Sequence, residues 1–254
     1  MSAPVPPILR SLALAGLLAS TYAAGAWFDV FLGGWRLRAC FEPPAAEAQR
    51  ASALHTLRRL REFASEDFAA NRGAVLLLGS STIERWPLED CFPGKRAQNH
   101  GLANASLELE ERVFNACLTS ATPAGVVLYA GSLDLREPVE PIEQALARLP
   151  RLVQRLRVRY GPSLPITLLG ILPARSMDEA AHKALDAANE SLRILARENA
   201  LAFLPTARAP LASADGTLEQ SLSLDNLHLN PAGYRVLARW LVTEGGEAGR
   251  KLAP

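Results

Sequence analysis

The sequence predicts an α/β fold: a doubly wound, three-layer sandwich around a parallel sheet of about five strands. Two observations predict it. Short apolar runs without polar alternation recur along the chain, and segments of helical periodicity separate them. Strands that lack polar alternation are buried on both faces, as in a parallel sheet covered by helices. The chain has 254 residues, 49% of them hydrophobic, which is enough for one well-buried core.

Residues 1–38 are predicted to be a membrane anchor or an export signal. No residue is charged from Ser11 to Phe28, a length that can just span a bilayer as a helix. The apolar run after Arg10 and the small residues Ala24-Gly25-Ala26 also fit a cleaved signal peptide. Both alternatives stay open. Either one places the protein at a membrane or on the periplasmic or other extracytoplasmic side, as in bacteria.

The rest of the chain divides into a linker and one domain. Residues 39–50, which include Pro43-Pro44, are predicted to be the linker, and residues 51–254 the domain. Apolar residues at helical spacing predict a first helix over 47–70. Strands are then expected at 74–78, 96–99 (a weaker run), 125–129, 165–172 and 201–204. Helices are expected at 107–118, 142–160, 178–199 and 232–242.

Charge and cysteine content exclude several classes of function. The net charge is +1, so no charge excess indicates binding to nucleic acid. The cysteines Cys40, Cys91 and Cys117 lack metal-ligand spacing. Cys91 and Cys117 could pair in an oxidising compartment, but buried free thiols are the simpler expectation. No metal cluster, phosphate loop or nucleotide fingerprint is present in the sequence, so no cofactor is expected.

Ser81 is the candidate nucleophile. It follows the apolar run 74–78 through Gly79-Ser80 and precedes a segment that can begin a helical turn. In a doubly wound sheet, sites form at the carboxyl ends of the strands. Such a turn exposes the hydroxyl, and the N–H groups of a helix start can stabilise negative charge beside it. A serine hydroxyl is a poor nucleophile, however, and needs an adjacent base.

Asp225 and His228 supply the missing base and its partner. A carboxylate three residues before a histidine can accept a hydrogen bond from one imidazole nitrogen, which leaves the other nitrogen free to face the serine. The structural alternative is that Asp225 caps the final helix. However, Asn230 and Pro231 already form a helix entry there, which leaves Asp225 and His228 without a structural role.

Four ordered segments together resemble the SGNH, or GDSL-like, esterase and lipase family. The segments are 78–83 (Leu-Gly-Ser-Ser-Thr-Ile), 99–104 (Asn-His-Gly-Leu-Ala-Asn), 129–135 (Tyr-Ala-Gly-Ser-Leu-Asp-Leu) and 225–228 (Asp-Asn-Leu-His). The resemblance covers about 200 residues. It implies a flavodoxin-like sandwich and hydrolysis of carboxylic esters by Ser81, His228 and Asp225 without a cofactor. The substrates implied are short acyl esters, including acetyl groups on glycans, or lipid esters.

The resemblance also implies an oxyanion hole with three donors, and two of their positions depart from the family pattern. The first donor, the backbone N–H of Ser81, is retained. The second falls on Asn104 where the family has glycine, although a shifted register would place Gly101 there. The third, an asparagine side chain in the family, falls on Leu133, which has no donor. Loss of one oxyanion donor typically costs on the order of 10²–10³ in turnover.

Two side chains could compensate for Leu133. Asn104 could turn its amide toward the oxyanion, or Ser132 could offer its hydroxyl. Two other functions also stay open. The domain could be a catalytically impaired module that binds an acylated glycan or a protein, or an acyltransferase that uses the same triad.

Three further polar residues are predicted to lie outside the catalytic group. His100 is expected in a loop or at the rim of the site. Asp134 is expected to bond to loop backbone, and Asn189 is expected to be a packing or capping residue on its helix.

Overall fold

The computed structural model describes residues 44–66, 72–119 and 121–253, with side chains from residue 48 onward. The chain divides into two compact units, residues 1–55 and 56–254, and the second contains the sheet. The predicted anchor or signal segment and Cys40 lie outside the described residues. Within the described part, no helix is both long and apolar enough to cross a bilayer.

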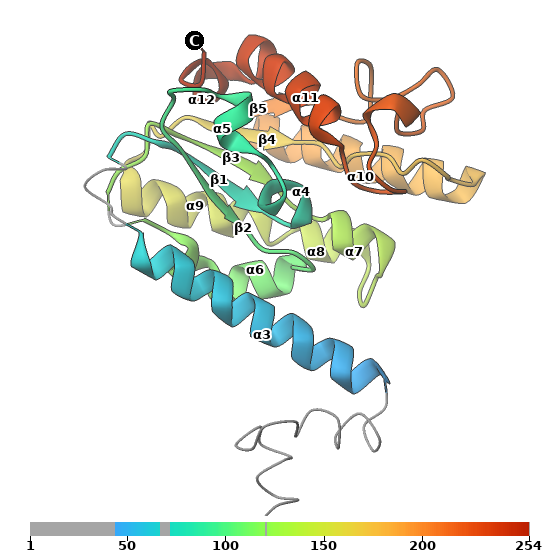
Figure 1. The fold of residues 1–254 in the computed structure, drawn as a ribbon, viewed down its shortest axis with the longest axis horizontal. Coiled ribbons are helices and arrows are strands. Elements are labelled where there is room, and N and C mark those ends of the chain that lie inside the picture. The colour runs from blue at the N-terminus through green and yellow to red at the C-terminus, as the bar shows by residue number, and fades with distance from the viewer. Residues whose placement is uncertain (1–43, 67–71, 120, 254) are drawn as a thin grey trace, which may run out of the picture. The chain divides into compact units, whose positions relative to one another are not determined.

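The sheet has five strands, all parallel, in the order β2-β1-β3-β4-β5. This confirms the predicted fold class (Figure 1). The strands are β1 (Val75–Gly79), β2 (Ala97–Gly101), β3 (Gly125–Tyr129), β4 (Ile166–Leu169) and β5 (Ala202–Leu204). In this order β2 lies on one side of β1, and β3, β4 and β5 lie on the other, so the strand order reverses between β1 and β3. Doubly wound sheets form their sites at this point.

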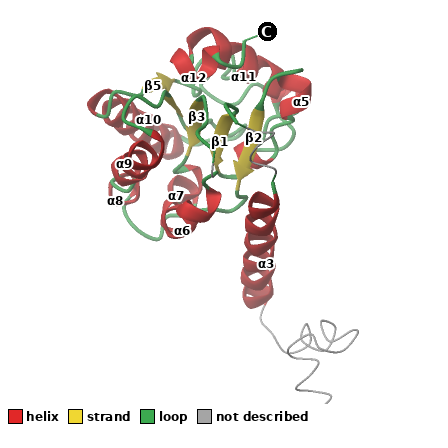
Figure 2. Cartoon of the chain, turned by 90° about the vertical axis from the view of Figure 1, so that its left-hand side faces the viewer, coloured by secondary structure: helices red, strands yellow, loops and turns green. Residues whose placement is uncertain are grey.

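Helices cover both faces of the sheet (Figures 1 and 2). Those that follow the first described helix, α3 (Pro44–Ser65), are α4 (Ser81–Glu84), α5 (Leu88–Cys91), α6 (Leu107–Val113), α7 (Ser132–Arg136), α8 (Ile142–Leu146), α9 (Leu149–Tyr160), α10 (Glu179–Glu198), α11 (Pro231–Glu244) and α12 (Gly246–Arg250). Two 3₁₀ turns, η1 (Phe114–Cys117) and η2 (Gln220–Leu222), complete the described elements.

Alternate residues of each central strand enter separate cores, because successive side chains of a strand point to opposite faces. Leu76 and Leu78 of β1 join one core, to which α6, α8, α9 and α10 contribute. Val75 and Leu77 join the other, to which α4 and α11 contribute. All five residues of β1 are buried. The absence of polar alternation in its sequence therefore reflects burial on both faces.

The elements differ from the predicted ones mainly at their ends. The segment predicted as one helix over 142–160 is two, because Pro150 lies in the first turn of α9, where a residue without an N–H begins a helix readily. The 107–118 helix ends in a 3₁₀ turn, and the 165–172 strand is four residues long. Helix α3 begins at Pro44, inside the segment predicted as a linker. Cys91 and Cys117 are free thiols.

Gly79 ends β1 at a point where no side chain fits. Its φ is +147°, and a Cβ built there would lie 2.0 Å from the carbonyl oxygen of Tyr129 on β3. We therefore expect Gly79→Ala to lower the free energy of unfolding by about 2–4 kcal/mol. The control is Gly94→Ala, at φ +70° with nothing within 4 Å, for which the left-handed backbone alone costs about 1–2 kcal/mol. Urea denaturation measures both, and equal losses would contradict the steric argument.

Candidate active site

The carboxyl ends of three neighbouring strands meet in register. Gly79 of β1 pairs with Gly101 of β2 on one side and with Tyr129 of β3 on the other. The loops that follow these strands therefore leave the sheet side by side. They carry the first three of the four segments singled out in the sequence.

Ser81 is the first residue of α4, and Ser80 is its N-cap. The Ser80 N–H donates to the Tyr129 carbonyl at 3.3 Å, which holds the turn against β3. Residues at the first helical position have no intrahelical acceptor for their N–H. Ser81 thus has its hydroxyl and its backbone N–H at the same end of α4. The residue is 9% exposed, so the hydroxyl is reachable only through a cavity that Ser81 and His228 line.

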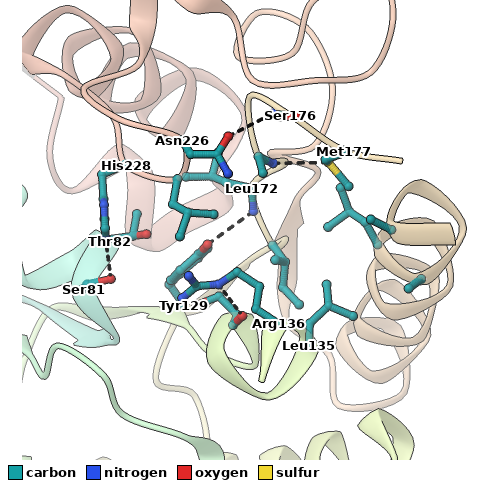
Figure 3. Close-up of a pocket in the computed structure, with 17 residues that line it drawn as sticks. Ser81, Thr82, Tyr129, Leu135, Arg136, Leu172, Ser176, Met177, Asn226 and His228 are labelled. Atoms are coloured by element: carbon teal, nitrogen blue, oxygen red, sulfur yellow. Dashed lines mark hydrogen bonds between the residues drawn. The ribbon is translucent and has the colours of Figure 1, made fainter. Parts of the chain in front are cut away.

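Asp225 and His228 form a tight turn beside Ser81. One carboxylate oxygen of Asp225 accepts the backbone N–H groups of Leu227 at 2.7 Å and of His228 at 2.8 Å. The Nδ1 atom of His228 lies 2.8 Å and 3.0 Å from the two carboxylate oxygens. Its Nε2 atom lies 3.1 Å from Ser81 Oγ (Figure 3). The structure brings together the three residues that the sequence singled out.

The pKa of Asp225 keeps this carboxylate ionised. Burial by itself would raise the pKa, but hydrogen bonds from the Leu227 N–H and from His228 outweigh it and lower the pKa to about 2. Arg85 lies 3.9 Å from the same carboxylate. An ionised Asp225 accepts the Nδ1–H of His228, so Nε2 is left to accept the Ser81 proton.

Helix α11 fixes the turn that carries His228. Asn230 caps the helix by accepting the Gly233 N–H at 2.9 Å, as predicted, and Pro231 is its first residue. The hydroxyl of Tyr234 then donates to the carbonyl of Thr82 in α4 at 2.9 Å. This bond joins the helix after His228 to the helix that carries Ser81, across 152 positions of sequence.

The residues predicted to form or replace the oxyanion donors differ in backbone conformation, exposure and contact with the cavity. Asn104 has φ +58°, the left-handed conformation that suits glycine and that asparagine tolerates. Its side chain is exposed. The Gly101 N–H already donates to the side chain of Asn99 at 3.0 Å. Leu133 is half-buried on α7 and does not line the cavity beside Ser81, whereas Ser132 does.

A cavity of about 320 Å³ opens from Ser81 and His228. In Figure 3 these two side chains lie at one end of it, and Leu135 and Met177 lie at the other. Most of its wall comes from the segment after β4, from α7 and from α10. The aliphatic residues of that wall are Leu135, Ile171, Leu172, Ala174, Met177, Ala181, Ala184 and Leu185, together with Leu227 from the turn before His228.

Three polar residues expected outside the catalytic group are structural. Asp134 accepts the Leu107 N–H at 3.0 Å, as predicted. Asn189 bonds to both backbone groups of Ile171, which ties α10 to the end of β4. The prediction for His100 was wrong: it is buried in β2, stacked on Phe63, and its ring bonds to Glu66. Side chains alternate between the two faces of a strand, and the place of His100 in this alternation could have indicated that its side chain is buried.

Sequence reasoning missed the residues that shape the cavity. Met177 and the α10 alanines lie in a segment without a motif, and the packing of α10 on β5, α7 and α8 makes them neighbours of Ser81. The bond between the hydroxyls of Ser80 and Ser132, 3.0 Å long, was also not anticipated. Within the described residues, no group of three or more His, Cys, Asp or Glu side chains could hold a metal ion.

Comparison with known sequences places this site in a family. The sequence profile of the GDSL-like lipase/acylhydrolase family matches residues 77–236, which include Ser81, Asp225 and His228. The chain belongs to the GDSL-like lipase/acylhydrolase family. This establishes the resemblance expected from the four segments and supports a hydrolase. No curated protein matches the chain in sequence.

Solved structures share the fold at low identity. One is a Streptococcus pneumoniae protein suggested to be a platelet activating factor (23% identity, TM-score 0.68, 78% of this chain and 95% of that one). A second is a GDSL-like lipase from Bacteroides thetaiotaomicron (18%, 0.59, 72% and 92%). A third is an acetylxylan esterase from Geobacillus stearothermophilus (17%, 0.56, 69% and 95%). At these identities the likeness concerns the fold.

Proposed function

We propose that this protein hydrolyses carboxylic esters with Ser81 as nucleophile, His228 as general base and acid, and Asp225 as the group that orients His228. The 3.1 Å contact between Ser81 Oγ and His228 Nε2, with Nδ1 held by Asp225, is the observation that carries the proposal. Membership of an acylhydrolase family supports it. The substrate would be a small-molecule, glycan or lipid ester.

The reaction balances with these groups and water. Ser81 Oγ attacks the carbonyl carbon as its proton passes to His228 Nε2, and the resulting imidazolium is stabilised by the Asp225 carboxylate. Collapse of the tetrahedral intermediate breaks the carbon–oxygen bond, and the imidazolium returns the proton to the leaving alcohol. Water then attacks the acyl-enzyme with His228 again as base, which releases the acid and restores Ser81.

Backbone donors for the oxyanion would come from α4 and from the loop after β2. The N–H of Ser81 stands at a helix start, where donors without intrahelical partners favour negative charge. The left-handed backbone of Asn104 supports its position as the equivalent of the family glycine. Its exposed side chain gives no support to an amide turned toward the oxyanion.

The second prediction separates an enzyme from a binding module. We expect Ser81→Ala and His228→Ala to abolish covalent labelling by a fluorophosphonate probe. Hydrolysis of simple esters should fall on the order of 10⁵–10⁶-fold for each variant. Both readouts need the nucleophile and its base but not a substrate-specific pocket. Thermal denaturation of each variant serves as the control for folding.

Labelling of wild-type protein that survives Ser81→Ala would contradict the proposed nucleophile. No labelling and no hydrolysis by the wild type would favour the binding module. The argument for that function is Leu133, which has no hydrogen-bond donor where the family has an asparagine. Product analysis with added alcohol acceptors separates hydrolysis from acyl transfer, because only transfer yields a new ester.

The pKa of Asp225 gives the third prediction. A group whose pKa is lowered in the folded protein stays ionised above that value and loses its contribution as the pH falls through it. Because that value is about 2, Asp225 should remain a carboxylate throughout the range in which the protein is assayed. Asp225 should therefore add no ionisation to the plot of log kcat/KM against pH between pH 4 and 7, so the slope of that plot there should not exceed 1. A limb of slope 2 there, in a protein that circular dichroism shows to be folded, would contradict the assignment.

A further inference from the structure

The cavity beside Ser81 changes in character along its length. Ser81 and His228 lie at one end, Arg136, Asn226 and Ser176 line its middle and upper part, and the end toward Leu135 and Met177 is mainly aliphatic (Figure 3). Such apolar pockets with a few convergent polar groups are typical of small-molecule sites. The polar end matches the ester group of a substrate, and the aliphatic end matches a hydrocarbon chain.

Small residues of α10 keep the far end open. Ala181, Ala184 and Leu185 follow helical spacing along one face of α10 and line the cavity, and Leu185 continues into the buried core. Ala181 and Ala184 are exposed, so they form an edge where the cavity opens to solvent, and a larger aliphatic side chain there would narrow it. Met177, just before the helix, is half-buried and completes the wall.

The position of His228 indicates which half of the ester occupies this space. The leaving oxygen must lie within hydrogen-bond reach of His228 Nε2 to receive its proton. The alcohol half therefore leaves the carbonyl carbon on the His228 side, and the acyl half points away from it, toward Leu135 and Met177. We propose, on the basis of the proposed ester hydrolysis, that the aliphatic end of the cavity holds an unbranched acyl chain of about six to eight carbons. We call this end of the cavity the acyl chamber.

The volume sets the length. At roughly 30 Å³ per heavy atom, the share of one molecule in liquid water, a cavity of about 320 Å³ holds about ten heavy atoms. Two ester oxygens and six to eight acyl carbons account for that number. An acetyl group would leave most of the aliphatic wall uncovered, and burial of each further methylene favours binding.

The test is a series of p-nitrophenyl esters with acyl chains of two to twelve carbons. We expect kcat/KM to rise about threefold or more with each added methylene up to six to eight carbons, and to level off or fall beyond. A parallel series of acetate esters with alcohols of increasing length should be flat. Dependence on the alcohol rather than the acyl length, or a maximum at acetate, would overturn the proposal.

A pair of variants on α10 ties the preference to the chamber. Ala184→Leu should lower the ratio of octanoate to acetate ester hydrolysis at least about tenfold, because the added side chain narrows the far end. Ala187→Leu is the matched control: both positions are exposed on α10, but Ala187 does not line the cavity, and the ratio should not change. Equal effects of the two variants would overturn the assignment of the chamber.

A binding measurement keeps this proposal distinguishable from the proposed catalysis. Calorimetry with octanoate should detect binding to Ser81→Ala protein, at least about tenfold weaker when Ala184→Leu is added. If no ester is hydrolysed and octanoate still binds in this pattern, the catalytic proposal fails and the acyl chamber stands. No binding, or binding unaffected by Ala184→Leu, overturns the chamber.

A second observation concerns the donor missing at Leu133. Ser132 precedes it on α7, is 6% exposed and lines the cavity together with Ser81. Its Oγ lies 3.0 Å from Oγ of Ser80, which is 3% exposed. One hydroxyl of such a pair donates and the other accepts. When Ser80 donates, the proton of Ser132 is free to point into the cavity and is polarised by the bond that Ser132 accepts.

From this pair we infer that the Ser132 hydroxyl donates to the oxyanion in place of the asparagine absent at position 133. The proton stays on Ser132 throughout, because the role is that of a hydrogen-bond donor. Ser80 acts through Ser132 and is a positioning residue. This inference also depends on the proposed ester hydrolysis, which the Ser81 variants test separately.

Kinetics of four variants test the inference. Ser132→Ala should lower kcat about 10- to 100-fold with little change in KM, since the lost bond forms only in the transition state. Ser80→Ala should lower kcat less, about three- to tenfold. Ser191→Ala, at a half-buried position of α10 that does not line the cavity, is the control and should leave both constants unchanged.

The fourth variant, Ser132→Thr, keeps the hydroxyl at the same position. It should retain kcat to within a few-fold of the wild type, whereas Ser132→Ala should not, because only alanine removes the donor. A kcat in Ser132→Thr as low as in Ser132→Ala, with folding confirmed by its thermal midpoint, would show that the hydroxyl does not supply this donor. An unchanged kcat in Ser132→Ala, with folding confirmed by its thermal midpoint, would also overturn the inference.

Discussion

The close approach of β1 to β3 is the constraint on which the site depends. The Gly79 backbone passes so near the Tyr129 carbonyl that no Cβ fits, and the next N–H, that of Ser80, donates to the same oxygen. The chain has to turn at this point and begin α4 at once, with Ser81 first. The same approach brings Ser80 within bonding distance of Ser132, at the start of α7. One backbone contact thus places the nucleophile and the hydroxyl beside it.

The C-terminal half of the site is located by a different kind of interaction. The turn from Asp225 to His228 is held locally by two backbone N–H groups on one carboxylate oxygen, but nothing local relates it to Ser81. That relation comes from α11, whose Tyr234 donates to Thr82 and packs its ring beside Trp86. A buried hydroxyl without a partner would cost about 1–3 kcal/mol. Tyr234 therefore favours one position of α11 against α4, and thereby one position of the His228 imidazole.

Features that depend on residues close together in the sequence could be predicted from it. Features that depend on packing between distant segments could not. The apolar runs of the strands lack polar alternation and so indicate burial on both faces, which is why the parallel sheet could be predicted. The spacing of three residues between Asp225 and His228 indicated that these two side chains pair. The split of one helix at Pro150 also has a local signal, the proline itself. The acyl chamber and the Ser80–Ser132 pair could not be predicted, because each joins segments about 50 to 100 positions apart through packing alone. His100 was misplaced because its burial depends on Phe63 and Glu66, from a distant helix and the turn after it.

Among the triad residues, His228 distinguishes a catalytic site from a binding module most sharply. Asp225 has a structural role, since its carboxylate closes a turn by accepting two backbone N–H groups, and a binding domain could retain it for that reason. Ser81 could be retained as a small residue at a crowded helix start. The His228 ring serves neither purpose, because its described hydrogen bonds are those to Asp225 and to Ser81. An imidazole that lies 3.1 Å from a serine hydroxyl, while a carboxylate with a pKa of about 2 holds its other nitrogen, is arranged for proton transfer. The departures from the family pattern at positions 104 and 133 leave that arrangement intact.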